Sequence, residues 1–155
     1  MAATYREQYD RMRRWYYRLV ILNEGRLHDM PSDNYLDEIY AFFMNCYHFK
    51  DWIKNDDTVA GTVQQTVEAH INSSRPLKLC ADICNSLKHL RLTSSRSGER
   101  PAFGKKQFGL VLGTAPTTID LKYEVNTTTG PIDTFQLATD CIDDWDAFLT
   151  ANGLK

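Results

Sequence analysis

The stretch Ser32–Lys54, SDNYLDEIYAFFMNCYHFKDWIK, decides the fold because it carries the strongest helical pattern in the chain. Its apolar residues recur at steps of three and four, which places them on one wide face of a helix. These residues are Leu36, Ile39, Tyr40, Phe43, Cys46, Tyr47, Phe49 and Ile53. Pro31 marks a break before the stretch, and Ser32 or Asp33 is a suitable N-cap. The pattern predicts one long helix that packs against other helices.

Three further helices are expected around this one. The segment 4–23 has no Pro or Gly, and Thr4 with Glu7 shows the spacing of a capping box. The segment 58–71 has valines at four-residue steps, and the segment 76–92 opens on a proline that suits the first turn of a helix. Short connections favour antiparallel neighbours, so residues 1–92 are predicted to form an antiparallel four-helix bundle.

The pattern changes after residue 92. Residues 93–106 are rich in Ser, Arg and Gly, which predicts a mobile loop. Alternating or β-branched residues then predict a small antiparallel meander, with strands at 107–112, 117–125 and 132–137. A terminal helix is expected from Thr139 or Asp140 to about Asn152. The predicted fold is mainly α: a four-helix bundle, a small antiparallel β-element and a C-terminal helix, in a single domain 1–155.

Composition and charge exclude several classes of protein. The chain has 155 residues, of which 43% are hydrophobic and 25% charged, as in an ordinary globular domain. No apolar stretch is long enough for a membrane span, and the N-terminus lacks the pattern of a signal peptide, so we expect a cytoplasmic protein without a membrane partner. The net charge of −2 conceals an asymmetry. Residues 88–106 carry six cations and one acid, whereas residues 120–155 carry seven acids and two cations.

The four cysteines are Cys46, Cys80, Cys84 and Cys141. A chain of this length can build a core without disulfides, so we expect free thiols. Their spacing is not that of a zinc site, and Cys80 and Cys84 fall on an apolar helix face as small buried side chains. Phosphate-binding and dinucleotide-binding glycine motifs are absent from the sequence. We therefore predict neither a metal nor another cofactor.

The stretch 82–89, DICNSLKH, is the most informative for function. Asp82, Asn85 and His89 are three and four residues apart, which stacks them on the polar face of one helix next to the basic segment. A histidine is suited to proton transfer near neutral pH, so these three residues are candidate catalytic groups. The candidate phosphate-binding residues are Lys88, Arg91, Arg96, Lys105 and Lys106. The alternative interpretation is that His89 is an ordinary solvated side chain without a catalytic role.

His48 and Asp51 on the strongest helix are candidates for a supporting role. If they face the fourth helix, a carboxylate orients an imidazole and sets its tautomer. The alternative is that both simply lie on the surface of their helix. A metal-dependent helical enzyme would need these residues to converge with His89.

A helical bundle whose late helix carries Asn85 and His89 as Asn-x-x-x-His resembles the HEPN superfamily. The resemblance covers about residues 1–92 and implies a metal-independent ribonuclease, or an RNA-binding relative, of toxin–antitoxin or antiphage defence systems. It also implies a homodimer in which two motifs meet. The family's motif arginine falls on Cys84 here, so phosphate contacts would depend on Lys88 or Arg91. The other prediction is a non-catalytic interaction module that binds a protein partner through the basic loop or the β-element.

Overall fold

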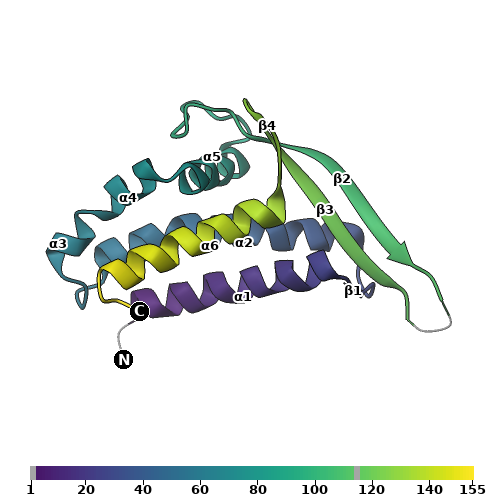
Figure 1. The fold of residues 1–155 in the computed structure, drawn as a ribbon, viewed down its shortest axis with the longest axis horizontal. Coiled ribbons are helices and arrows are strands. Elements are labelled where there is room, and N and C mark those ends of the chain that lie inside the picture. The colour runs from purple at the N-terminus through teal and green to yellow at the C-terminus, as the bar shows by residue number, and fades with distance from the viewer. Residues whose placement is uncertain (1–2, 114–115) are drawn as a thin grey trace.

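The computed structural model describes residues 3–113 and 116–155 of the chain. It is mainly helical, with a small antiparallel sheet and a C-terminal helix, which confirms the coarse prediction (Figure 1). The helices are α1 (Tyr5–Glu24), α2 (Ser32–Asn55), α3 (Gly61–Gln64), α4 (Val67–Ser73), α5 (Arg75–His89) and α6 (Thr134–Ala151). The strands are β1 (Arg26–Leu27), β2 (Ala102–Val111), β3 (Thr118–Thr127) and β4 (Gly130–Asp133).

The helices α1, α2 and α6 lie side by side and form the body of the molecule (Figure 1). Aromatic pairs join α1 to α2, with Tyr9 5.8 Å from Phe49 and Tyr16 6.0 Å from Phe42 between ring centroids. From the first pair to the second, the residue number rises along α1 and falls along α2, so these two helices are antiparallel. The Tyr5 hydroxyl donates to the Leu154 carbonyl at 2.5 Å, which joins the two ends of the described chain.

The helix α5 crosses α2 and does not continue an antiparallel bundle. Cys80 lies against the Phe43 carbonyl and Cys84 lies beside His48, so residue numbers rise together along both helices at the contact. The place next to α1 is taken instead by α6, which packs against α1, α2 and α5. The prediction that the first four helices form the bundle by themselves was therefore wrong. Packing of the C-terminal helix overrides the preference for neighbours in sequence.

The segment predicted as one helix over 58–71 is two short helices, α3 and α4. Gly61 and a run of β-branched residues lower its helix propensity. Only Val67 and Ile71 of the short helices are fully buried, so packing does not compensate along the whole segment.

The sheet is centred on β3, which pairs with β2 along its length and with β1 and β4 on its other side, always antiparallel. Alternate residues of β3 are buried against the helices: Ile119, Leu121, Tyr123 and Val125. The hairpin of β2 and β3 projects past the helical body (Figure 1).

Two strand boundaries differ from the prediction. β2 begins at Ala102, so Lys105 and Lys106 lie on a strand and not in a loop. The last strand ends at Asp133, whose side chain accepts from the Gln136 amide at 3.0 Å and caps α6. This cap starts the terminal helix at Thr134, ahead of the predicted Thr139 or Asp140, because an Asp at an N-cap satisfies an otherwise unpaired helix amide.

Candidate functional site

The helix α5 presents the candidate residues and is defined at both ends. The Ser74 hydroxyl accepts from the Leu77 amide at 3.0 Å as the N-cap, and Pro76 lies in the first turn as predicted. The helix stops at His89 because Leu90 has a φ of 60°. Lys88 and His89 thus occupy the exposed last turn, where the helix dipole favours positive charge.

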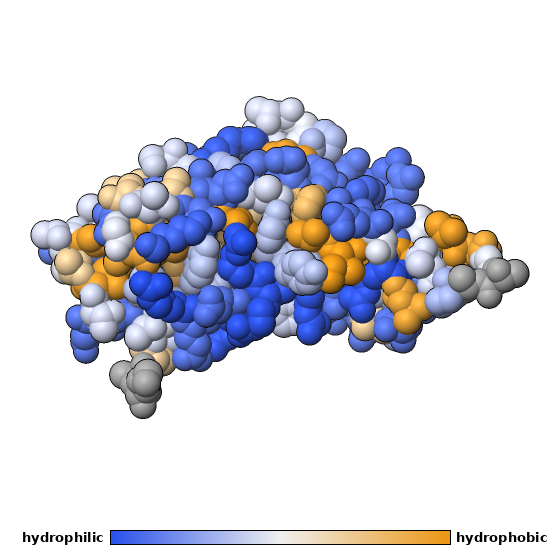
Figure 2. All heavy atoms as spheres, turned by 60° about the horizontal axis from the view of Figure 1, so that its bottom comes forward, coloured by the Kyte–Doolittle hydropathy of each residue, from blue (hydrophilic) through white to orange (hydrophobic). Residues whose placement is uncertain are grey.

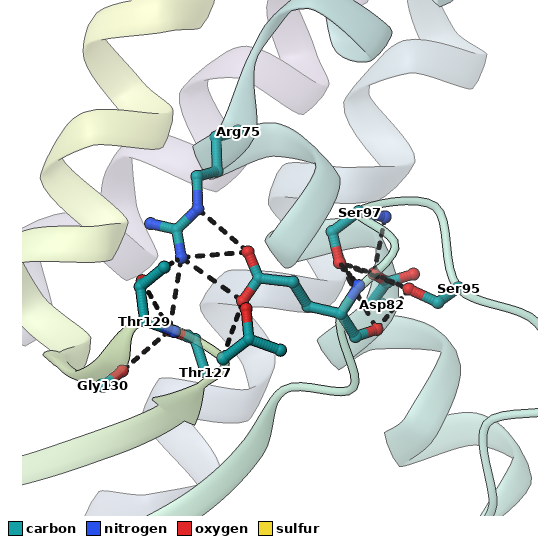
Figure 3. A network of polar contacts seen from close by, with 9 residues as sticks. Arg75, Asp82, Ser95, Ser97, Thr127, Thr129 and Gly130 are labelled. Atoms are coloured by element: carbon teal, nitrogen blue, oxygen red, sulfur yellow. Dashed lines mark hydrogen bonds and ion pairs between the residues drawn. The ribbon is translucent and has the colours of Figure 1, made fainter.

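Asp82 does not join Asn85 and His89 on an open surface, as its spacing predicted. Its side chain is fully buried. The carboxylate accepts from the Ser95 hydroxyl at 2.9 Å, from the Arg96 and Ser97 amides at 2.6 and 2.9 Å, and from the Ser97 hydroxyl at 2.5 Å (Figure 3). The polar face of α5 is covered here by the loop, so Asp82 holds the loop in place.

The same loop is fixed to the sheet through Glu99, which pairs with Arg75. Figure 3 shows Arg75 beside Thr127 and Thr129 at the end of the sheet. The Arg75 guanidinium donates to Glu99 at 3.0 Å and to the hydroxyls of Thr127 and Thr129. Burial acts to raise the pKa of Glu99, but hydrogen bonds from Arg75 and the Thr128 amide lower it on balance. Residues 95–99 are therefore an ordered connection in place of the expected mobile loop.

Arg96 is engaged with protein and does not present a phosphate-binding group. Its guanidinium forms an ion pair with Glu68, which also pairs with Lys54 at 2.9 Å and with Lys50 at 3.4 Å. Burial acts to raise the pKa of Glu68, but these cations lower it to about 2. Sequence reasoning missed Glu68 because it lies 28 positions from Arg96.

The crossing of α2 and α5 brings His48 and Asp51 towards the α5 residues. The His48 Nε2 lies 4.0 Å from the Cys84 sulfur, and Lys88 and Asp51 are near enough to influence the Cys84 thiol. Burial raises the pKa of that thiol to about 11. In the described part of the chain, no hydrogen bond joins His48 or Asp51 to His89. The two helices share a surface, but they do not form a paired catalytic dyad.

Four candidate cations remain available to a ligand. Lys88, Arg91, Lys105 and Lys106 are all exposed, and within residues 3–113 and 116–155 none of them forms an ion pair. Lys106 lies over the Tyr123 ring at 5.8 Å, and the Tyr123 hydroxyl lies 3.4 Å from that of Tyr40 on α2. Lys88 follows Cys84 by one turn of α5, and Cys84 lies beside His48 of α2. His48 is eight residues, or about 12 Å, beyond Tyr40 along α2. The exposed cations therefore form two groups, Lys88 and Arg91 at the end of α5 and Lys105 and Lys106 on β2.

The outer edge of β2 is a second exposed surface. β2 is the edge strand of the sheet, and Phe108, Leu110, Val111 and Leu112 are 37, 54, 66 and 77% exposed. Figure 2 shows hydrophobic atoms gathered at this end of the molecule, beside the grey atoms. An unpaired edge with a cluster of exposed apolar side chains is typical of an interaction site.

Three thiols meet in the core. The sulfur atoms of Cys46, Cys80 and Cys141 lie within 4.8 Å of one another, and all three residues are buried. Burial raises the pKa of the Cys80 and Cys141 thiols. Burial acts in the same direction on Cys46, but the neighbouring Cys141, Cys80 and Trp145 side chains lower the pKa of that thiol on balance. The sequence placed each cysteine in an apolar stripe and gave no signal that the three stripes meet.

Comparisons of this chain with protein-family models, curated proteins and solved structures found no match. Within the described residues, no helix combines the length and the apolar character that a membrane span requires.

Proposed function

We propose that this chain is a HEPN-like RNA-binding protein that contacts the phosphate backbone with the last turn of α5. The observation that carries the proposal is the exposure of Lys88, His89 and Arg91 at one helix end, where the described residues offer the two cations no ion pair. His48 from α2 extends this surface. Cations without acidic partners supply most of the non-specific affinity for nucleic acid.

The proposal is binding without cleavage by these residues. Asp82 is occupied by four donors from the loop, and Arg96 is paired with Glu68. The position that the family's motif gives to arginine is held by Cys84, a buried thiol. Among the described residues, Asp82 is thus not available to orient the His89 imidazole, and the motif position carries no arginine; a general base needs such positioning to act.

Equilibrium binding of a fluorescein-labelled single-stranded RNA tests this proposal. The double variant Lys88→Ala/Arg91→Ala should lower the affinity about tenfold, since two exposed ion pairs are worth about 1.4 kcal/mol together. The matched control is Arg6→Ala/Arg14→Ala, which removes two exposed cations from α1 and should leave the affinity within about twofold of wild type. Equal losses in both variants would contradict the assigned surface.

A cleavage assay in EDTA separates binding from catalysis. We expect the RNA to stay intact with wild-type protein. Cleavage that persists in EDTA and disappears in His89→Ala would overturn binding without cleavage and support a metal-independent endoribonuclease.

The β2 edge favours a second candidate function, an interaction module that pairs with another copy of this chain. In an antiparallel pair about a twofold axis, the half of β2 with Lys105 and Lys106 lies opposite the partner's apolar half. Like charges then avoid each other, and the exposed Phe108 and Leu110 are covered. We infer a homodimer joined through this edge.

Sedimentation equilibrium tests the homodimer. Wild-type protein should be dimeric. Leu110→Lys/Leu112→Lys should be monomeric because each copy brings two additional lysines to the paired edge, opposite Lys105 and Lys106 of the other copy. Tyr17→Lys changes a side chain that is 65% exposed on α1 and should leave the dimer intact. A monomeric wild type, or a dimer that both variants retain, would exclude this edge as the interface.

A further inference from the structure

The core contains a cluster of sulfur ligands that the proposed function does not use. Cys46 comes from α2, Cys80 from α5 and Cys141 from α6, so three separate helices contribute to one point. Each side chain is at most 1% exposed. The Cys80 sulfur is 3.5 Å from the Phe43 carbonyl, and the Cys141 sulfur is 3.5 Å from the Pro76 carbonyl. The thiols are thus held at the meeting point of the helices.

The spacing suits a metal ion bound by three sulfurs. A triangle with sides of at most 4.8 Å has corners at most about 2.8 Å from its centre. Thiolate–zinc bonds are about 2.3 Å long. Side-chain rotations that move each sulfur by a few tenths of an ångström therefore bring all three to bonding distance. If the cysteines served only as small apolar side chains, each could fill its own place in the core without lying next to the other two.

The donor set points to monovalent copper in preference to zinc. A structural zinc ion takes four ligands in a tetrahedron. In the described residues, the cluster consists of three cysteines without a histidine or carboxylate, and all three are shielded from bulk solvent. Soft thiolates bind both zinc and monovalent copper, so the ligand number decides: monovalent copper accepts three thiolates, whereas structural zinc takes four ligands.

One neighbouring polar group favours an anionic sulfur site. The indole Nε1 of Trp145 is buried and has no hydrogen-bond partner of normal geometry among the described residues. The same N–H lies near the Cys46 sulfur. A buried donor without an acceptor is costly, and a metal-bound thiolate would satisfy it.

We propose that Cys46, Cys80 and Cys141 form a buried binding site for one monovalent copper ion. The thiols that bind lose their protons, and the bound ion joins α2, α5 and α6 at the centre of the fold. Because the site is enclosed, the ion enters during folding or when the helices separate locally.

Anaerobic refolding with Cu(I), followed by challenge with a copper chelator, tests this site. Wild-type protein should retain one copper per chain and melt at a higher temperature than the metal-free protein. Cys141→Ser should lose the copper, whereas Cys84→Ser should retain it, because Cys84 is a buried cysteine on α5 outside the cluster. Circular dichroism of each variant checks that it is folded.

X-ray absorption of the wild-type protein makes the test independent of any variant. Three sulfur ligands with no nitrogen or oxygen ligand would support the site. Failure of the folded wild type to retain copper, retention by the folded Cys141→Ser variant, or preferential uptake of four-coordinate zinc would overturn it.

Discussion

Replacing Asp82 with alanine should release the loop that covers α5. The substitution removes the carboxylate that accepts hydrogen bonds from two hydroxyls and two backbone amides. The hydroxyls of Ser95 and Ser97 can turn to water, but the Arg96 and Ser97 amides are fixed by the backbone. Each amide left without a partner costs about 1–3 kcal/mol, and the half-buried loop places both near the middle of that range. Two such amides should therefore lower the free energy of unfolding by about 4 kcal/mol.

Urea unfolding measures this loss, and amide hydrogen exchange locates it. The Arg96 and Ser97 amides should lose protection in Asp82→Ala, while β3 keeps its own. Asp143→Ala removes an exposed carboxylate from α6 and should change stability by less than about 0.5 kcal/mol. A loss below about 1 kcal/mol in Asp82→Ala, with both amides still protected, would refute the view that this carboxylate holds the loop.

Two further predictions concern the ends of α5 and the ion pairs beside it. Ser74→Ala removes the N-cap and a hydrogen bond to Asp144, so it should lower the free energy of unfolding in urea by about 1–2 kcal/mol. The control Ser73→Ala should lower it by less than about 0.5 kcal/mol. Equal effects of the two substitutions would contradict the cap. Glu68→Gln tests the pKa that the surrounding cations lower from 4.5 to about 2. A lowered carboxyl pKa stabilises the fold above pH 4.5, and this contribution is lost as the pH falls towards 2, so the stability gap between wild type and variant should close across that window. A gap that is constant from pH 6 to pH 2 would contradict the ion-pair assignment.

The sequence predicted what local patterns determine. The apolar face of α2, the proline in the first turn of α5 and the apolar stripe of α6 all follow from periodicity and capping within one segment. Cys80 and Cys84 were expected to be buried, and both are.

The remaining features depend on contacts between distant segments. Asp82 lies on the polar face of its helix, so the local pattern predicts an exposed side chain. It is buried because residues 95–99 fold back over this face. Glu68 removes Arg96 from the candidate phosphate-binding set by a contact that no local pattern reports. The crossing of α5 over α2 likewise depends on α6 occupying the place beside α1. Local propensity carries no information on such tertiary contacts.

The salt dependence of RNA binding tests the central claim most directly. For single strands, the logarithm of the binding constant falls with the logarithm of the salt concentration by about 0.7 for each phosphate that a cation neutralises. If Lys88 and Arg91 each contact one phosphate, Lys88→Ala/Arg91→Ala should show a slope shallower than wild type by about 1.4, and Arg6→Ala/Arg14→Ala should keep the wild-type slope. Identical slopes for wild type and the α5 variant would contradict the account.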